Sequence, residues 1–244
     1  PCHSGGLSDS GTSVFDPVLC ELSYAWYTRD GDRVIDPFAG GSVRGIVASH
    51  MGRSYTGVEL RPEQVEANRE QAAEICSSDA PEWIVGDSAR IDELVRSDGY
   101  DFLFTCPPYA DLEVYSDDPA DISNMPHVEF IEAYRAIMAK AVAKLADDRF
   151  AVVVIGDARD REGFYYNLPG ITVQAMEDAG ARYYNEAILV TPAGSLPIRA
   201  GKQFTASRKL GKTHQNVLTF VKGDPKRATE RLGDVVIPDM TGEE

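Results

Sequence analysis

Short apolar runs alternate with amphipathic stretches along most of this chain. The runs that predict strands, each rich in apolar or β-branched residues and bounded by turn residues, lie near residues 33–36, 55–58, 82–85, 100–105, 150–155, 182–190 and 216–222. The stretches with helical spacing of apolar positions lie at 18–27, 61–75, 126–145 and 168–179. A further helix is expected after Gly41, with an apolar face of Val43, Ile46, Val47 and Met51 and an end at Gly52.

This alternation predicts an α/β fold, a seven-stranded sheet with helices on both faces. Residues 1–223 are expected to form a single domain, since a chain of this length needs no second core. The long polar segment 191–215 separates the last two strands, and we expect it to be a loop without a helix. The polar residues 224–244 are expected to form a loose C-terminal tail.

The first expected strand runs into a glycine turn, Asp36-Pro37-Phe38-Ala39-Gly40-Gly41. Glycines let a ligand approach the backbone, and the N-terminus of the next helix lies beside it. Asp36 would repel a pyrophosphate and attract a cationic ligand. Glu59 ends the second strand, where a carboxylate suits the two hydroxyl groups of a ribose. Nicotinamide dinucleotide sites share this geometry, but their G-x-G-x-x-G spacing is missing here.

A second candidate site follows the fourth strand, at Thr105-Cys106-Pro107-Pro108-Tyr109. Two consecutive prolines stop the strand and fix the backbone. Tyr109 is thereby placed at a rigid strand end, where open α/β sheets bind their ligands. Such a corner offers a carbonyl acceptor and a stacking ring to a planar group that carries an amine. An ordinary turn with an aromatic lid is the alternative interpretation.

These two motifs, in this order and spacing, resemble the DNA amino-methyltransferases of bacteriophages and bacteria, which use S-adenosylmethionine. The first motif of that family reads Asp-Pro-Phe-x-Gly-x-Gly, and its catalytic motif has Asp, Asn or Ser before Pro-Pro-Tyr. The resemblance runs from about Phe15 to Lys222. It implies a Rossmann-like class I methyltransferase fold, mostly parallel, with an antiparallel last strand. The chain departs from the family at Ser42, where a second spaced glycine is common, and at Cys106.

The resemblance implies that S-adenosylmethionine binds beside the glycine turn. Asp87 ends the third strand, where it would contact adenine, and it is also a good helix cap; the two roles are compatible. Phe15 resembles the segment that lines the methionine end of the cofactor, although a hydrophobic staple before a helix fits equally well. The expected cofactor-binding residues are Phe15, Asp36, Pro37, Phe38, Gly40, Gly41, Glu59, Asp87 and Ser88.

The implied reaction is methyl transfer to the exocyclic amine of a flipped base, without a metal ion. The implied catalytic residues are Cys106, Pro107, Pro108 and Tyr109. The carbonyl of Pro107 and the side chain of residue 106 would accept the amine hydrogens, and Tyr109 would stack on the base. We favour N4 of cytosine, because Thr-Ser-Pro-Pro-Tyr is typical of N4-cytosine enzymes and differs only by oxygen for sulfur.

Three alternatives stay open. A non-catalytic module of the same fold that binds cofactor or nucleic acid is one, because the Cys106 thiol is a weak acceptor. An N6-adenine DNA methyltransferase is another, since the first side chain of the motif is an imperfect guide to the base. The third is an enzyme that methylates RNA or a protein glutamine, because the same corner can hold any planar amide or amine.

The net charge of −15 over 244 residues argues against a generic nucleic-acid binder. However, residues 198–227 hold eight basic residues and one acid, so this segment carries +7 and the remainder −22. Interleaved polar and aromatic residues make the segment suitable for DNA phosphates, with a solvated loop as the alternative. The expected DNA contacts are Arg199, Lys202, Arg208, Lys209 and Lys212. Target recognition is expected from the 191–215 segment, from a domain that precedes Pro1, or from a partner subunit.

The four cysteines lack paired C-x-x-C spacing, so we expect thiols in a reducing compartment, the bacterial cytoplasm, and no zinc site. No apolar run is long enough to span a bilayer and no signal peptide is visible, so no membrane partner is expected. The acidic residues between 111 and 121 lack the spacing of a calcium loop, and their role is left open.

Overall fold

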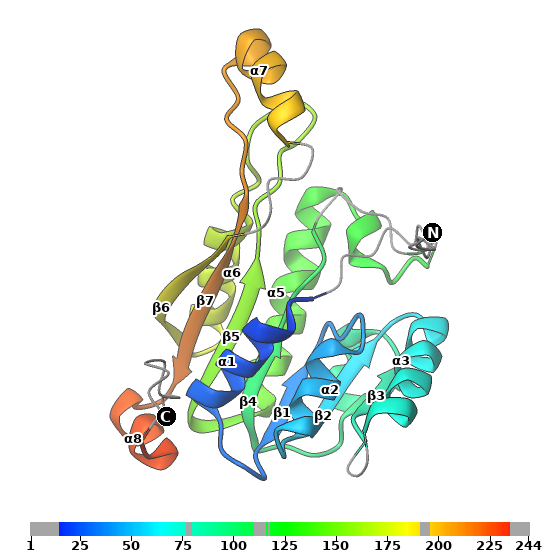
Figure 1. Ribbon diagram of the computed structural model, residues 1–244, viewed down its shortest axis with the longest axis vertical. Helices are drawn as coiled ribbons and strands as arrows, with labels where there is room; N and C mark the ends of the chain where they lie inside the picture. Colours follow the sequence, from blue (N-terminus) through cyan, green and yellow to red (C-terminus); the bar gives the residue numbers. More distant parts are fainter. Residues whose placement is uncertain (1–14, 77–79, 110–115, 117, 191–195, 235–244) are drawn as a thin grey trace, which may run out of the picture.

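A seven-stranded sheet forms the centre of the computed structural model, which describes residues 15–76, 80–109, 116, 118–190 and 196–234 (Figure 1). The strand order is β3-β2-β1-β4-β5-β7-β6. The strands are β1 (Arg33–Asp36), β2 (Ser54–Glu59), β3 (Glu82–Val85), β4 (Tyr100–Thr105), β5 (Leu145–Ile155), β6 (Ala181–Val190) and β7 (His214–Lys222). Only β7 runs antiparallel to its neighbours, β5 and β6. The expected mostly parallel sheet with an antiparallel last strand is confirmed.

Helices cover both faces of the sheet, as the alternating pattern predicts. One face carries α1 (Pro17–Tyr27), α2 (Val43–His50), α3 (Pro62–Ile75) and α8 (Pro225–Leu232). The other carries η1 (Ser88–Arg90), α4 (Ile91–Leu94), η2 (Ile122–Asn124), α5 (His127–Lys144) and α6 (Leu168–Asp178). Leu103 of β4 packs on the α5 side, whereas Phe102 and Phe104 pack on the α1 side. Burial on both faces explains the nearly continuous apolar runs of the central strands.

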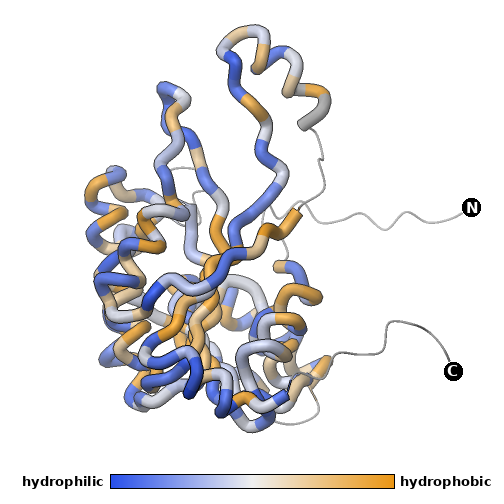
Figure 2. The backbone as a smooth tube through the Cα atoms, turned by 90° about the vertical axis from the view of Figure 1, so that its left-hand side faces the viewer, coloured by the Kyte–Doolittle hydropathy of each residue, from blue (hydrophilic) through white to orange (hydrophobic). Residues whose placement is uncertain are grey.

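The segment between β6 and β7 differs from the prediction, because α7 (Leu196–Ser207) forms within it. This helix projects beyond the sheet on the extended ends of β6 and β7, clear of the rest of the molecule (Figures 1 and 2). Pro197 falls in its first turn, where a proline needs no hydrogen-bond partner. The prediction of a loop was wrong. The expected sign of a helix, apolar residues buried against a core, is missing at Ile198, which is 80% exposed, and at Phe204, which is exposed too.

The expected loose tail was also wrong in part, because α8 is an ordered helix. Asp224 caps it by accepting a hydrogen bond from the backbone nitrogen of Lys226 at 2.8 Å. Ala228 is buried. Arg231 donates hydrogen bonds to Asp32 and to Asp101, each at 2.8 Å. Asp32 directly precedes β1, and Asp101 is the second residue of β4. Ion pairs across the sheet edge therefore hold a helix whose sequence shows little apolar character.

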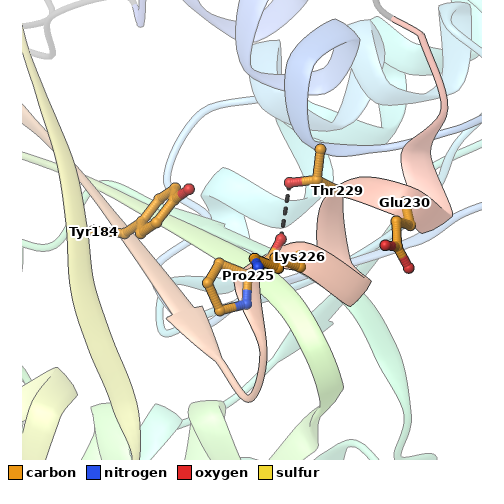
Figure 3. Close-up of a pocket in the computed structure, with 5 residues that line it drawn as sticks. All are labelled: Tyr184, Pro225, Lys226, Thr229 and Glu230. Carbon is orange, nitrogen blue, oxygen red and sulfur yellow. Dashed lines mark hydrogen bonds between the residues drawn. The ribbon is translucent and has the colours of Figure 1, made fainter.

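A shallow depression of about 410 Å³ lies between α8 and β6 (Figure 3). Its lining residues are Tyr184, Pro225, Lys226, Thr229 and Glu230. The hydrogen bond drawn there, from the Thr229 hydroxyl to the Pro225 carbonyl at 2.8 Å, is an ordinary bond within one helical turn. Because α8 packs at the amino-terminal ends of β1 and β4, this depression lies away from the ligand-binding edge of the sheet. None of the described helices has the length and apolarity that a bilayer crossing needs.

Candidate functional site

The glycine turn and the Pro-Pro-Tyr corner lie side by side at the carboxyl edge of the sheet. They follow β1 and β4, which pair in parallel with Ile35 opposite Leu103. The hydroxyl of Thr105, the last residue of β4, donates to Oδ1 of Asp36 at 2.6 Å. This bond ties together the two segments that the sequence singles out, at the edge where α/β sheets bind ligands.

Asp36 is completely buried, and hydrogen bonds occupy both of its carboxylate oxygens. Besides Thr105, Oδ1 accepts from the backbone nitrogen of Phe38 at 3.0 Å. Oδ2 accepts from Nε of Arg44 and from the Tyr55 hydroxyl, each at 2.7 Å. Burial, reinforced by the Asp36 charge, raises the pKa of Tyr55 and keeps its hydroxyl a donor. Instead of presenting an open carboxylate to a cationic ligand, Asp36 in this structure fixes the turn.

Arg44 of α2 is a site residue that the sequence analysis missed. Its side chain is 4% exposed, and it donates to the carbonyl oxygens of Phe38 at 2.8 Å and Ala39 at 2.9 Å. The Phe15 ring lies 4.6 Å from the guanidinium carbon and 5.7 Å from the Phe104 ring. Burial disfavours the charged form, but the Asp36 carboxylate outweighs it and raises the pKa of Arg44 above its ordinary value. One guanidinium thus holds both the acid and the backbone of the turn.

The inner face of α2 explains why Arg44 was missed. The buried positions are Arg44, Gly45 and Ala48, whereas the expected apolar face is only partly buried. The signal available in the sequence was Ala48, four positions after Arg44. Residues at this spacing lie on the same face of a helix, and a small residue there allows the helix to pack closely. The expected end at Gly52 is confirmed, with φ of +77° directly after the helix.

Glu59 lies at the end of β2 and faces the glycine turn, in the predicted position. Its Oε2 accepts from the backbone nitrogen of Gly40 at 2.9 Å, and Oε1 accepts from that of Arg61 at 3.0 Å. Asn68 of α3 donates to the carbonyl of Gly40 at 2.8 Å. Gly40 has φ of +52°, a conformation that favours glycine, and a Cβ built on Gly40 or Gly41 would meet nothing within 4 Å. The turn is thus firmly held and leaves room for a ligand.

The third strand end joins the same edge. Asp87 accepts from the backbone nitrogen of Ala89 at 2.8 Å, which confirms its expected role as a helix cap. The Ser88 hydroxyl donates to the carbonyl of Pro37, so the segments after β1 and β3 are connected. Pro37 is buried, and the Phe38 ring stacks on Tyr134 at 6.2 Å. The contact of Asp87 with adenine stays a prediction.

Tyr109 is fixed by two strands outside its own motif. Its hydroxyl accepts from the backbone nitrogen of Gly156, just after β5, at 2.9 Å and from Nε2 of Gln215 in β7 at 2.5 Å. A Cβ at Gly156 would lie 3.1 Å from that hydroxyl, so a glycine there allows the close approach. Cys106 is partly buried against the cluster that contains Phe104. Pro107 is buried and Pro108 half-buried.

The predicted DNA contacts lie on or after α7, on the same edge as Tyr109, because β7 begins there with His214 and Gln215. Lys202 and Arg208 are exposed, and Lys209 is partly exposed. Lys212 donates to Oδ1 of Asn216 at 3.4 Å. The structure does not describe the side chain of Arg199, residues 191–195, or the acidic residues Asp111, Glu113 and Asp117. Among the described residues, no three His, Cys, Asp or Glu side chains gather as metal ligands would.

Several of the solved structures with similar folds are described as methyltransferases. The crystal structure of TrmN from Thermus thermophilus has a TM-score of 0.55 and 14% identity, over 84% of this chain and 48% of that chain. Magnesium protoporphyrin IX methyltransferase from Synechocystis PCC 6803, solved with bound SAM, has a TM-score of 0.55 and 13% identity, over 85% and 79%. A putative RNA methyltransferase from Pyrococcus horikoshii has a TM-score of 0.54 and 15% identity, over 85% and 82%. The chain therefore has the class I methyltransferase fold.

Sequence similarity to a curated protein is confined to a short stretch. The Type II methyltransferase M.XycI of Xanthomonas campestris pv. cyanopsidis is 40% identical over 53 residues, which make up 22% of this chain and 18% of that protein. The match thus spans less than a fifth of the relative's length. No family model matches the chain.

Proposed function

We propose that this chain is an S-adenosylmethionine-dependent methyltransferase that acts on the exocyclic amine of a DNA base, with N4 of cytosine favoured. The observation that carries the proposal is the direct link between the glycine turn and the Pro-Pro-Tyr corner, through Thr105 and Asp36. A methyl donor at the turn and a base at the corner would then be neighbours. The local similarity to a Type II methyltransferase supports a DNA substrate.

The residues at the turn fit the proposed cofactor. Gly40 and Gly41 leave space in front of the backbone, and Glu59 offers a carboxylate, 11% exposed, to a ribose. Asp87 stands at the third strand end, in the position expected for an adenine contact. S-adenosylmethionine would supply an electrophilic methyl group to this site. Because Arg44 neutralises Asp36, we assign Asp36 to the support of the turn.

The corner supplies the groups that the acceptor amine needs. The backbone of Pro107 is fixed by the following proline, so its carbonyl has a defined direction. It would accept one hydrogen of the amine, with the Cys106 thiol beside it as the weaker second acceptor. The ring of Tyr109 would stack on a base that has left the duplex. These residues would orient the nitrogen toward the methyl group, and positioning of this kind supplies much of the rate in a displacement reaction.

The proposal is tested by incubating the protein with labelled S-adenosylmethionine and unmethylated duplex DNA, followed by digestion to nucleosides. We expect N4-methyldeoxycytidine, and much less of it in a parallel incubation with Tyr109→Ala protein. N6-methyldeoxyadenosine would show that the base is adenine while the site assignment stands. Binding of cofactor without transfer to DNA, RNA or protein would favour the non-catalytic module.

Glu59→Ala is expected to weaken S-adenosylmethionine binding by about 1–3 kcal/mol, because the ribose hydroxyls lose their acceptor. Isothermal calorimetry measures this change. Glu63→Ala is the matched control, since Glu63 is an exposed acid in the first turn of α3, and its affinity should equal that of the wild type. Equal affinity in Glu59→Ala would remove Glu59 from the site. Tighter binding of a nicotinamide dinucleotide would contradict the assigned cofactor.

Neutralising Lys202, Arg208 and Lys209 together is expected to weaken DNA binding and to flatten its dependence on salt. Each lost phosphate contact lowers the slope of log K against log[salt] by about 1. Fluorescence anisotropy with a labelled duplex at several salt concentrations gives the slope, and cofactor affinity should not change. The control neutralises Arg29, Arg96 and Lys226, three exposed basic residues near the opposite edge of the sheet. An unchanged slope in the first triple variant would place DNA recognition elsewhere.

A further inference from the structure

The hydroxyl of Tyr109 receives a hydrogen bond from the strand that leads back from α7. Gln215 is the second residue of β7, and its Nε2 lies 2.5 Å from that hydroxyl. The backbone nitrogen of Gly156, the residue directly after β5, also donates to the Tyr109 hydroxyl, at 2.9 Å. We propose that Gln215 is a positioning residue, which fixes the ring of Tyr109 and couples the α7 projection to the catalytic corner.

Two donors that meet one phenolic oxygen from different strands restrict where the ring lies. The Gly156 bond sets the distance of the hydroxyl from the end of β5, and the close approach of Gly156 to the ring limits its sliding. The amide of Gln215 supplies the second direction, so the face that would stack on a base is held before the base arrives.

The same residue lies at the base of the α7 projection. Gln215 pairs with Leu189 across the antiparallel strands, and His214 with Val190, where β6 and β7 lead into the projection. Lys212, one of the proposed DNA contacts, is three residues away and bonds to Asn216. The α7 projection is therefore connected to the hydroxyl of Tyr109 through β7 and Gln215. DNA held by α7 would thus favour or disturb the orientation of the stacking ring.

This inference rests on the proposed function for the role of the ring, and Gln215→Leu tests it. We expect kcat for methylation of unmethylated plasmid DNA to fall roughly 3- to 10-fold, as for the loss of one hydrogen bond, with KM for DNA and for S-adenosylmethionine unchanged. In the Tyr109→Phe background, which lacks the acceptor, Gln215→Leu should cause no further loss. Gln174→Leu, at an exposed glutamine on α6, is the matched control. Additive losses in the double variant, or a change in KM alone, would overturn the proposal.

A second measurement does not depend on activity. In protein labelled with 3-fluorotyrosine, the ¹⁹F resonance that disappears in Tyr109→Phe reports on Tyr109. We expect this resonance to shift in Gln215→Leu but not in Gln174→Leu, and to respond to added duplex DNA only when Gln215 is present. An identical resonance in wild type and Gln215→Leu would overturn the positioning role. If the wild type transfers no methyl group, the proposed function fails, while the resonance still decides whether Gln215 holds Tyr109 and transmits DNA binding.

Discussion

Replacing Arg44 by methionine is expected to destabilise the protein by about 3–5 kcal/mol, the cost of leaving one member of a buried ion pair without its partner. The Asp36 carboxylate has no exposed surface from which water could replace the guanidinium. The carbonyl oxygens of Phe38 and Ala39 lose their donors in the same change. The glycine turn loosens as a result, so the affinity for S-adenosylmethionine should fall together with stability.

Urea unfolding monitored by circular dichroism measures the loss in stability. The matched control is Arg90→Met, which removes an exposed pair with Glu93 and should cost far less stability, because solvent screens an exposed ion pair. Adding Asp36→Asn to Arg44→Met removes the uncompensated charge, so the double variant should be more stable than Arg44→Met alone. A cost for Arg44→Met as small as that of the control would mean that the Asp36 charge does not depend on Arg44.

Tyr109→Ala is expected to abolish most methyl transfer. Stacking of a base on an aromatic ring is worth about 1–3 kcal/mol, and the same truncation removes the group that Gly156 and Gln215 hold in place. Tyr109→Phe keeps the ring and loses only the hydroxyl, so it should retain clearly more activity. Single-turnover methylation of plasmid DNA separates the two variants, and wild-type rates in Tyr109→Ala would take the ring out of the mechanism.

Cys106 provides the complementary comparison at this corner. If the thiol acts only as an acceptor for the amine hydrogens, Cys106→Ser should retain or raise activity, because a hydroxyl is the better acceptor. A covalent adduct between Cys106 and DNA that contains 5-fluorocytosine would contradict this role and indicate attack on the ring.

The sheet could be predicted from the sequence because its strands are buried on both faces. Residues 33–36, 82–85 and 100–105 form strands with the expected bounds. The two helices near the C-terminus could not be predicted in the same way. Ile198 and Phe204 of α7 are exposed, and α8 is held by buried Ala228 and by the ion pairs of Arg227 and Arg231 with residues distant in sequence. Apolar periodicity predicts burial against a core, whereas these two residues of α7 are exposed and α8 contains few apolar residues.

The candidate site shows the same division. The placement of Glu59 and Tyr109 at strand ends follows from local sequence, since turn residues and prolines mark where the strands stop. The partners that hold them do not. Arg44 lies on a helix, where an arginine is usually a surface residue, and Gln215 meets Tyr109 across 106 positions of the chain. The order of the strands in the sheet brings these groups together. A local stretch of sequence does not indicate which strands will be neighbours.

The ion pairs of Arg231 with Asp32 and Asp101 also affect how the chain reaches its native state. Arg231 joins Asp32 across 199 positions, so the contact is among the least local in the molecule. During synthesis the N-terminal part emerges first, and β1 and β4 are complete long before α8 leaves the ribosome. Until then Asp32 and Asp101 lack this cation at the amino-terminal edge of the sheet. Non-local contacts form slowly, because the chain loses the entropy of the closed loop before the contact contributes any favourable free energy. This edge is therefore closed late in folding, and a nascent chain that stalls before residue 225 carries an unclosed sheet.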